Sequence, residues 1–241
     1  APSTAMAEAR ESAGFISQTV KQASIEHRRG FVRKVYGILS AQLILTVAIA
    51  APLSQATDFV AEHSWLLWLS VAMTLGTVCA MSCCRSVART FPTNYMFLFI
   101  FTAFEAVLVG FVSAQYTWQS VVLAFVATAV IFLGMTAYAC MTKTDFTGCG
   151  PYLFGALLGL CVFGLILGIL SAFGVPVEMA VMFYDVIGVL LFTCYIVFDT
   201  QMILGQWGGH KLEFGLDDYV FAALNLYLDI INLFLHLLRL F

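Results

Sequence analysis

The feature that most constrains the fold is a series of seven apolar stretches, each long enough to cross a lipid bilayer as an α-helix. Only 10% of the 241 residues are charged, whereas a soluble domain carries about 25%. The stretches lack the alternation of a β-barrel, so helices must satisfy the backbone hydrogen bonds. The sequence therefore predicts an all-α polytopic membrane protein, a seven-transmembrane-helix bundle with spans at residues 35–53, 65–81, 95–112, 120–139, 152–170, 177–198 and 220–240.

The basic residues predict the orientation of these spans, because lysine and arginine concentrate in cytosolic segments. After seven crossings Arg239 lies on the far side of the membrane, whereas a re-entrant last segment would give six spans and a cytosolic C-terminus. We expect the full crossing. The other ten of the eleven basic residues then fall on the side of the N-terminus, which is predicted to be cytosolic: Arg10, Lys21, Arg28, Arg29, Arg33, Lys34, Arg85, Arg89, Lys143 and Lys211.

The chain divides into a short tail and one membrane domain. Residues 1–27 contain no apolar run of the kind found in a signal peptide and are expected to form a disordered cytosolic tail. Residues 28–241 are expected to form the seven-helix transmembrane domain. Since the connections between the spans are short, the function must lie in the bundle itself.

Two aspartates in consecutive spans are the strongest functional signal. Asp199 follows the sixth span at its predicted cytosolic end, and Asp229 lies inside the seventh. A charged residue at the centre of a membrane helix costs roughly 2.5–3.5 kcal/mol, so such residues are usually functional. Because the two helices are antiparallel neighbours, we expect the carboxylates to form a pH-sensing gate that titrates as a unit. Deprotonated, the pair would also be an oxygen site for Ca²⁺. The alternative is two unrelated polar residues.

Other polar residues within or beside the spans have weaker assignments. Arg89 or Arg85, near the depth of Asp199, could latch the aspartates through a charge-assisted bidentate bond, although both also serve as orientation signals. His236 is expected at the membrane interface. Four further residues are candidates for lining a pore: Glu105, Asp185, Asn225 and Asn232.

Four segments resemble the transmembrane Bax-inhibitor-motif family, particularly its lifeguard subgroup: residues 29–43 (RGFVRKVYGILSAQL), 101–105 (FTAFE), 198–201 (FDTQ) and 221–234 (FAALNLYLDIINLF). The resemblance covers the chain after about His27. It implies a seven-helix bundle whose C-terminal helix is central and wrapped by the other six. It also implies a pH-sensitive Ca²⁺ leak across an endomembrane, either the endoplasmic reticulum or the Golgi, and protection from cell death.

The same resemblance matches Asp199 and Asp229 to the paired aspartates of the family. Bacterial members have an arginine that latches the pair, for which Arg89 is the preferred position here and Arg85 the second. Asp185 corresponds to no motif of the family that we can quote, so its role is left open.

These observations lead to a passive Ca²⁺ leak channel as the expected function, with the direction of its pH response left open. A non-conducting scaffold that regulates partner channels or apoptosis proteins is the alternative. An intramembrane aspartyl protease is a remote third possibility. Such an enzyme needs a glycine beside its aspartate so that a substrate strand can approach, and the residues before Asp229 include no glycine. We expect no enzymatic activity, no nucleic-acid partner, and no cofactor apart from Ca²⁺ as a permeant or bound ion. The expected partners are membrane lipids, Ca²⁺ and apoptosis-regulating or channel proteins, with the oligomeric state left open.

Overall fold

The structure, a computed structural model, describes residues 2–83, 90–205, 209 and 211–241, with the backbone alone for residues 2–25 and 82. The described residues contain helices and no strand, which confirms the predicted all-α class. The elements are α1 (Pro2–Gln55), α2 (Thr57–Glu62), α3 (Trp65–Cys83), α5 (Thr93–Ser113), α6 (Trp118–Met141), the 3₁₀ turn η1 (Thr147–Cys149), α7 (Gly150–Ala172), α8 (Glu178–Leu204) and α9 (Tyr219–Leu240).

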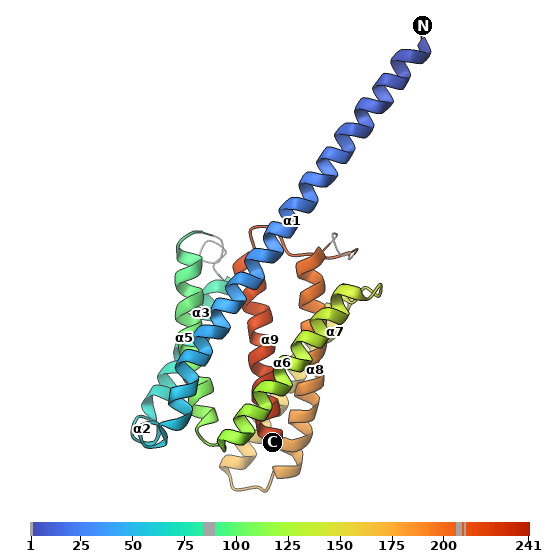
Figure 1. Ribbon diagram of the computed structural model, residues 1–241. Coiled ribbons are helices and arrows are strands. Elements are labelled where there is room, and N and C mark those ends of the chain that lie inside the picture. Colours follow the sequence, from blue (N-terminus) through green and yellow to red (C-terminus); the bar gives the residue numbers. More distant parts are fainter. Residues whose placement is uncertain (1, 84–89, 206–208, 210) are drawn as a thin grey trace.

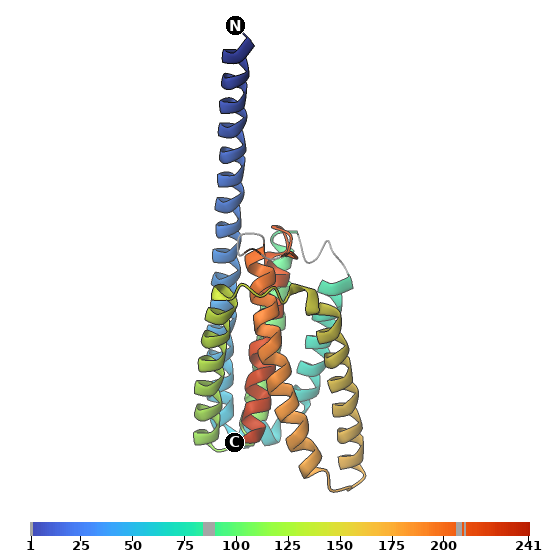
Figure 2. The same ribbon diagram turned by 90° about the vertical axis from the view of Figure 1, so that its right-hand side faces the viewer.

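Six of the seven predicted spans correspond to helices that are long and apolar enough to cross a membrane. The exception is the second span, since the apolar part of α3, Trp65–Met81, is shorter. α3 nevertheless packs against α5 within the bundle (Figures 1 and 2). That α3 also crosses the membrane therefore stays a prediction, and six helices are candidate spans by length and composition.

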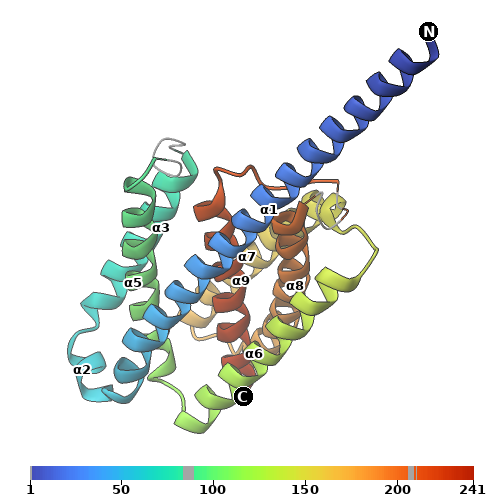
Figure 3. The same ribbon diagram turned by 45° about the horizontal axis from the view of Figure 1, so that its top comes forward.

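The C-terminal helix α9 is the core of the bundle. In its most apolar 18-residue stretch 72% of the residues are buried, against 11% in α6 and in the segment that contains α7. α9 packs against α1, α5, α6 and α8, and the view from above places it between them (Figure 3). Large apolar side chains on α6 and α7 face outward instead. This distribution is the one expected when lipid, and not water, surrounds the outer helices.

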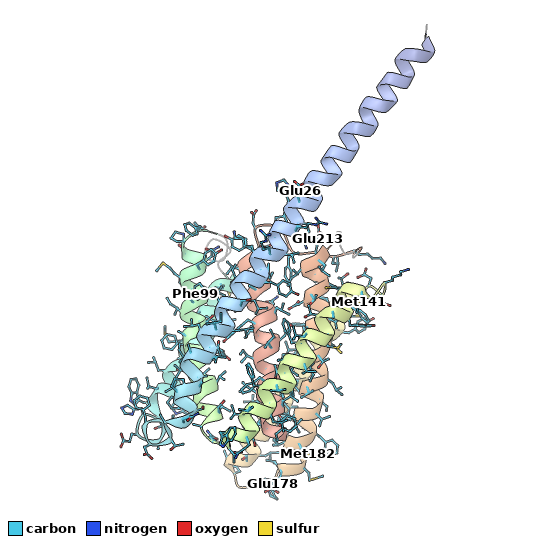
Figure 4. The ribbon with its side chains drawn as sticks, in the orientation of Figure 1. Glu26, Phe99, Met141, Glu178, Met182 and Glu213 are labelled. Atoms are coloured by element: carbon cyan, nitrogen blue, oxygen red, sulfur yellow. The ribbon has the colours of Figure 1, made fainter. Side chains whose placement is uncertain are left out.

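The bundle has two ends, which we name after the arginines found there. At the Arg28 end α1 enters the bundle, α8 ends and α9 begins; at the Arg239 end α9 finishes (Figure 1). Glu26 and Glu213 lie at the Arg28 end and Glu178 at the Arg239 end (Figure 4). α9 is one unbroken helix of 22 residues that runs from one end to the other. This is the form that a full crossing requires, and the crossing itself stays a prediction.

Helix α1 continues beyond the bundle. Its apolar, span-length part begins at Glu26, close to the predicted domain boundary, and its N-terminal part projects away from the other helices (Figure 1). The segment predicted as a tail is thus helical from Pro2 in this structure. Its disorder in solution stays a prediction.

Arg28 fixes the end of α8 that lies next to the candidate site. Its guanidinium is buried and donates hydrogen bonds to the backbone carbonyls of Met202 (2.7 Å), Leu204 (3.3 Å) and Phe214 (2.7 Å). The last carbonyls of a helix have no partner within the helix, so these bonds cap α8. Arg28 thereby joins α1 to α8 and to the α8–α9 linker.

Candidate functional site

The paired aspartates meet at the contact between α8 and α9. α8 does not end at Phe198 as predicted but continues to Leu204, so Asp199 lies about 7 Å inside the helix end at 1.5 Å per residue. The last turn is held by the Gln201 side chain, which bonds to the backbone of residues 144 and 146, and by the Arg28 cap. Asp199 therefore lies within a regular helix beside Asp229.

The two carboxyl groups are hydrogen-bonded to each other. Both residues are buried, Asp199 with 3% and Asp229 with 5% of its surface exposed. Ionised carboxylates only accept hydrogen bonds, so this contact requires a proton on one of the two. The Oδ2 atom of Asp229 has no hydrogen-bond partner among the described residues. The arrangement is therefore a carboxyl–carboxylate pair that binds one proton between two helices.

A cavity of about 400 Å³ opens beside this pair. Asn225 and Asn232 line it, one turn before and one turn after Asp229 on the same face of α9. That they line a pore stays a prediction. Asn232 donates its amide to the carbonyl of Leu228 (2.8 Å), which leaves its amide oxygen as the group available to a cation. The remaining lining residues come from α7, α8 and α9: Leu157, Leu160, Cys161, Tyr184, Phe192, Tyr195, Phe198, Asp199, Leu228, Asp229 and His236.

The polar groups of the cavity are suited to a hard cation in transit. Two carboxyl groups and two amides supply oxygen ligands, and Ca²⁺ takes 6–8 oxygen ligands in flexible geometry. Among the residues that the structure describes, no group of three or more His, Cys, Asp or Glu side chains could enclose a metal ion. Water would have to complete the coordination shell, as in a weak and exchangeable site.

Asp185 belongs to a separate cluster near the Arg239 end. Its Oδ1 atom lies 2.7 Å from Nδ1 of His236 and 2.8 Å from Nη2 of Arg239. It is not among the cavity-lining residues, whereas His236 is. That Asp185 lines a pore stays a prediction. The side chain of His236 is buried against α8 near the end of α9, and its position at the membrane interface stays a prediction as well.

Glu105 lies on the other side of α9, beside Tyr227, with which it interacts electrostatically. The Tyr227 hydroxyl is hydrogen-bonded to Thr46 of α1 at 2.8 Å. On α1, one turn before Thr46, the amide of Gln42 donates a hydrogen bond to the hydroxyl of Thr102 of α5 at 3.0 Å. Glu105 is thus part of a polar layer between α1, α5 and α9 and does not line the cavity of the aspartates.

The two latch candidates, Arg85 and Arg89, lie outside the described residues. Two other arginines, Arg28 and Arg239, bond to groups far away in the sequence. In the sequence alone, both indicate only the orientation of the spans. The spacing of Asn225, Asp229, Asn232 and His236 along one helical face was a signal that could have placed His236 inside the bundle.

Comparison with known proteins agrees with this architecture. Residues 28–241 match the family described as "Inhibitor of apoptosis-promoting Bax1". The chain is 38% identical to mouse protein lifeguard 4 over 223 residues, which cover 91% of this chain and 87% of the relative. It is 33% identical to human protein lifeguard 3 over 216 residues, which cover 88% of this chain and 68% of the relative. The chain therefore belongs to the Bax-inhibitor family and is similar to its lifeguard members.

Proposed function

We propose that the protein is a pH-responsive passive Ca²⁺ leak channel of an endomembrane, the endoplasmic reticulum or the Golgi, and that it suppresses cell death. The observation that carries the proposal is the buried, hydrogen-bonded Asp199–Asp229 pair on the wall of a cavity whose other lining residues are mainly apolar. An ionisable pair at this depth is expensive to maintain unless it serves protons or ions. The match to a family described as "Inhibitor of apoptosis-promoting Bax1" supports the proposed suppression of cell death.

The pair would act as the gate through its shared proton. With the proton bound, the hydrogen bond holds α8 against α9. Without it, two like charges face each other, and two unit charges about 4 Å apart repel by about 4 kcal/mol at an effective dielectric constant of 20. That is a change of roughly a thousandfold in a closed-to-open ratio, at about 1.4 kcal/mol per factor of ten. Loss of the proton therefore opens the gate, and flux rises with pH.

The neighbours of the pair modify this response. Tyr195 of α8 interacts electrostatically with both aspartates, and the carboxylates themselves would be ligands for a passing Ca²⁺. Arg89, or in second place Arg85, is the proposed latch. A guanidinium bonded to the deprotonated pair would offset the repulsion between the carboxylates.

The charge distribution supports a cytosolic N-terminus. At the Arg28 end, basic residues gather on α1 and on the neighbouring connections, whereas Arg239 lies at the opposite end. By the positive-inside rule the Arg28 end faces the cytosol. The Asp199–Asp229 pair, nearer to that end, would then be a cytosolic gate. The described basic residues of this end are Arg28, Arg29, Arg33, Lys34, Lys143 and Lys211.

The proposal is tested by Ca²⁺ flux into liposomes that contain the purified protein, from mildly acidic to mildly alkaline pH. Wild type is expected to conduct more as pH rises. Asp229→Asn should conduct little at every pH, because an amide donates to Asp199 whatever the pH. Asp58→Asn, the same change at an exposed position on α2, is the matched control and should behave as wild type.

A non-conducting regulator of partner proteins is the second candidate, since the family description names a protein, Bax1, as the target of inhibition. Its discriminating result is an absence of flux above that of protein-free liposomes at any pH. Such a result would reject the channel and leave the regulator. Neither candidate requires catalysis, and we infer that the protein is not an enzyme.

A further inference from the structure

A buried ionic cluster closes the α8–α9 contact near the Arg239 end. It consists of Asp185 in the third turn of α8 and of His236 and Arg239 in the last turns of α9. The Asp185 side chain is 1% exposed and that of His236 is 4% exposed, whereas the Arg239 side chain is 36% exposed. The buried carboxylate and imidazole are therefore fixed, and the arginine is the member of the cluster that reaches the surface.

The distances within the cluster determine how its hydrogen bonds run. Nδ1 of His236 lies 2.7 Å from Oδ1 of Asp185 and 3.1 Å from Nη2 of Arg239. A carboxylate only accepts and a guanidinium only donates, so the shorter contact requires a proton on Nδ1. His236 thus donates to Asp185, and Arg239 donates to the same oxygen at 2.8 Å. Both donors use Oδ1, and Oδ2 of Asp185 has no hydrogen-bond partner among the described residues.

The surroundings hold the imidazole in place. The ring of His236 lies 5.2 Å from that of Tyr184 and 5.6 Å from that of Phe192 between centroids. Gly188 of α8 lies against the ring, and a Cβ there would come within 2.6 Å of three ring atoms. The His236–Asp185 bond is therefore rigid. The guanidinium of Arg239 is 5.4 Å from the centroid of the Tyr184 ring.

The cluster is continuous with the cavity of the paired aspartates. His236 and Tyr184 both line that cavity. Along α9, His236 is seven residues beyond Asp229, or about 10 Å at 1.5 Å per residue. The cluster therefore borders the cavity on the side of the Arg239 end.

We propose that Asp185 is a second binding site for a divalent cation and that the guanidinium of Arg239 occupies it as a tethered competitor. When Arg239 turns outward, the Asp185 carboxylate presents two oxygens, and the Nδ1–H of His236 continues to orient one of them. A carboxylate of this kind is the ligand that Ca²⁺ prefers. The role of this site as the far exit rests on the proposed leak function, whereas cation binding itself does not.

The test measures binding and not transport, so it stands whatever the flux experiment gives. The probe is Tb³⁺ luminescence of the detergent-solubilised protein, displaced by Ca²⁺, in an Asp199→Asn/Asp229→Asn background that removes the first site. Arg239→Gln is expected to raise the affinity at least about tenfold, as expected when a competing full charge is removed. Adding Asp185→Asn should abolish this gain. Lys211→Gln, the same change in charge at the other end, should have no effect.

Tyr184 provides a spectroscopic signature of the location. A Tb³⁺ ion in place of the guanidinium would lie close to the Tyr184 ring, because Arg239 is 5.4 Å from its centroid. Tyr184→Phe should therefore reduce the sensitised emission while leaving the Ca²⁺ concentration needed for displacement unchanged.

Two results would overturn the proposal: an affinity of Arg239→Gln no greater than that of Lys211→Gln, or a gain that survives Asp185→Asn. Either would mean that the cluster is only a structural ion pair. If Arg239→Gln does not fold, Arg239→Met, which keeps the apolar stem of the side chain, takes its place with the same expected outcomes.

Discussion

Replacing Gly188 by alanine should separate α8 from α9 at the Asp185 cluster. A Cβ at this position would lie 2.4 Å from Cε1, 2.5 Å from Nε2 and 2.6 Å from Cδ2 of His236. Carbon atoms in contact are about 3.5–4.0 Å apart, so the methyl group overlaps the ring by about 1 Å. The ring has little room to retreat, because Nδ1 is bonded to Asp185 and the faces pack against Tyr184 and Phe192.

The expected magnitude follows from three effects. Overpacking of this kind costs about 1–3 kcal/mol. If the ring turns away, the buried charged hydrogen bond to Asp185 is lost as well, at about 1.5–3 kcal/mol. Alanine in place of a helical glycine returns up to about 1 kcal/mol. With the bond to Asp185 lost, the three contributions give a net loss of stability of about 1.5–5 kcal/mol, which lowers the Tm of a chain of this size by several degrees.

The assay is thermal unfolding of the purified protein in detergent. Gly168→Ala is the matched control, because Gly168 is also inside a helix, α7, and a Cβ there meets no atom within 4 Å. The control is expected to be as stable as wild type or slightly more stable. In a His236→Ala background the obstacle is gone, so Gly188→Ala should no longer destabilise the protein, and the two changes should be strongly non-additive.

An unchanged Tm for Gly188→Ala would refute the close contact between the two helices. So would a loss of stability of the same size in the His236→Ala background, because the cost would then arise elsewhere than at the ring.

Three further changes test contacts that hold the other helices. Arg28→Ala should lower the Tm by several degrees, since each buried carbonyl left unpaired costs about 1–3 kcal/mol. Arg33→Ala, at an exposed position, should leave the Tm unchanged, and equal effects of the two changes would contradict the capping role of Arg28. Gln201→Leu removes the hydrogen bonds to the backbone of residues 144 and 146 and should accelerate amide hydrogen exchange in the connection between α6 and α7. Unchanged exchange rates in this connection would disprove the role of Gln201. Thr46→Val and Tyr227→Phe should each cost about 1 kcal/mol and together little more than one alone, whereas full additivity would show that the 2.8 Å bond contributes nothing.

The helices and the central pair could be predicted because their signals are local in the sequence. A stretch of apolar residues identifies a span without knowledge of its neighbours, and an aspartate within it is conspicuous for its cost. The exact end of α8 could not be predicted in this way. Its last turn contains Thr200 and Gln201, which read as the end of an apolar run but are buried by contacts with distant segments.

The roles of the arginines depend on pairing across the chain. Arg28 lies more than 170 residues from the carbonyls that it binds, and nothing near it in the sequence distinguishes it from the exposed Arg29 and Arg33. Arg239 and His236 meet Asp185 only because α8 and α9 are in one particular register. The periodic polar positions on α9 indicate a shared face, but they do not identify the partner on α8.

Two arginines, the buried Arg28 and the partly exposed Arg239, hold α8 at opposite ends and to different helices. Arg28 ties the end of α8 to α1, five residues or fewer beyond Asp199, and Arg239 ties the third turn of α8 to α9. α9 is itself anchored to α1 through Tyr227 and to α5 through the bond from Asn94 to Tyr219. Asp199 and Asp185 of α8 therefore face α9, and the opposite side of α9 is held by α1 and α5. Repulsion within the aspartate pair would be relieved mainly by movement of α8, against the Arg28 bonds. Because Arg239 holds the far end of α8 independently, opening at the pair does not by itself release Asp185, and a leak through this cavity would require both contacts to yield.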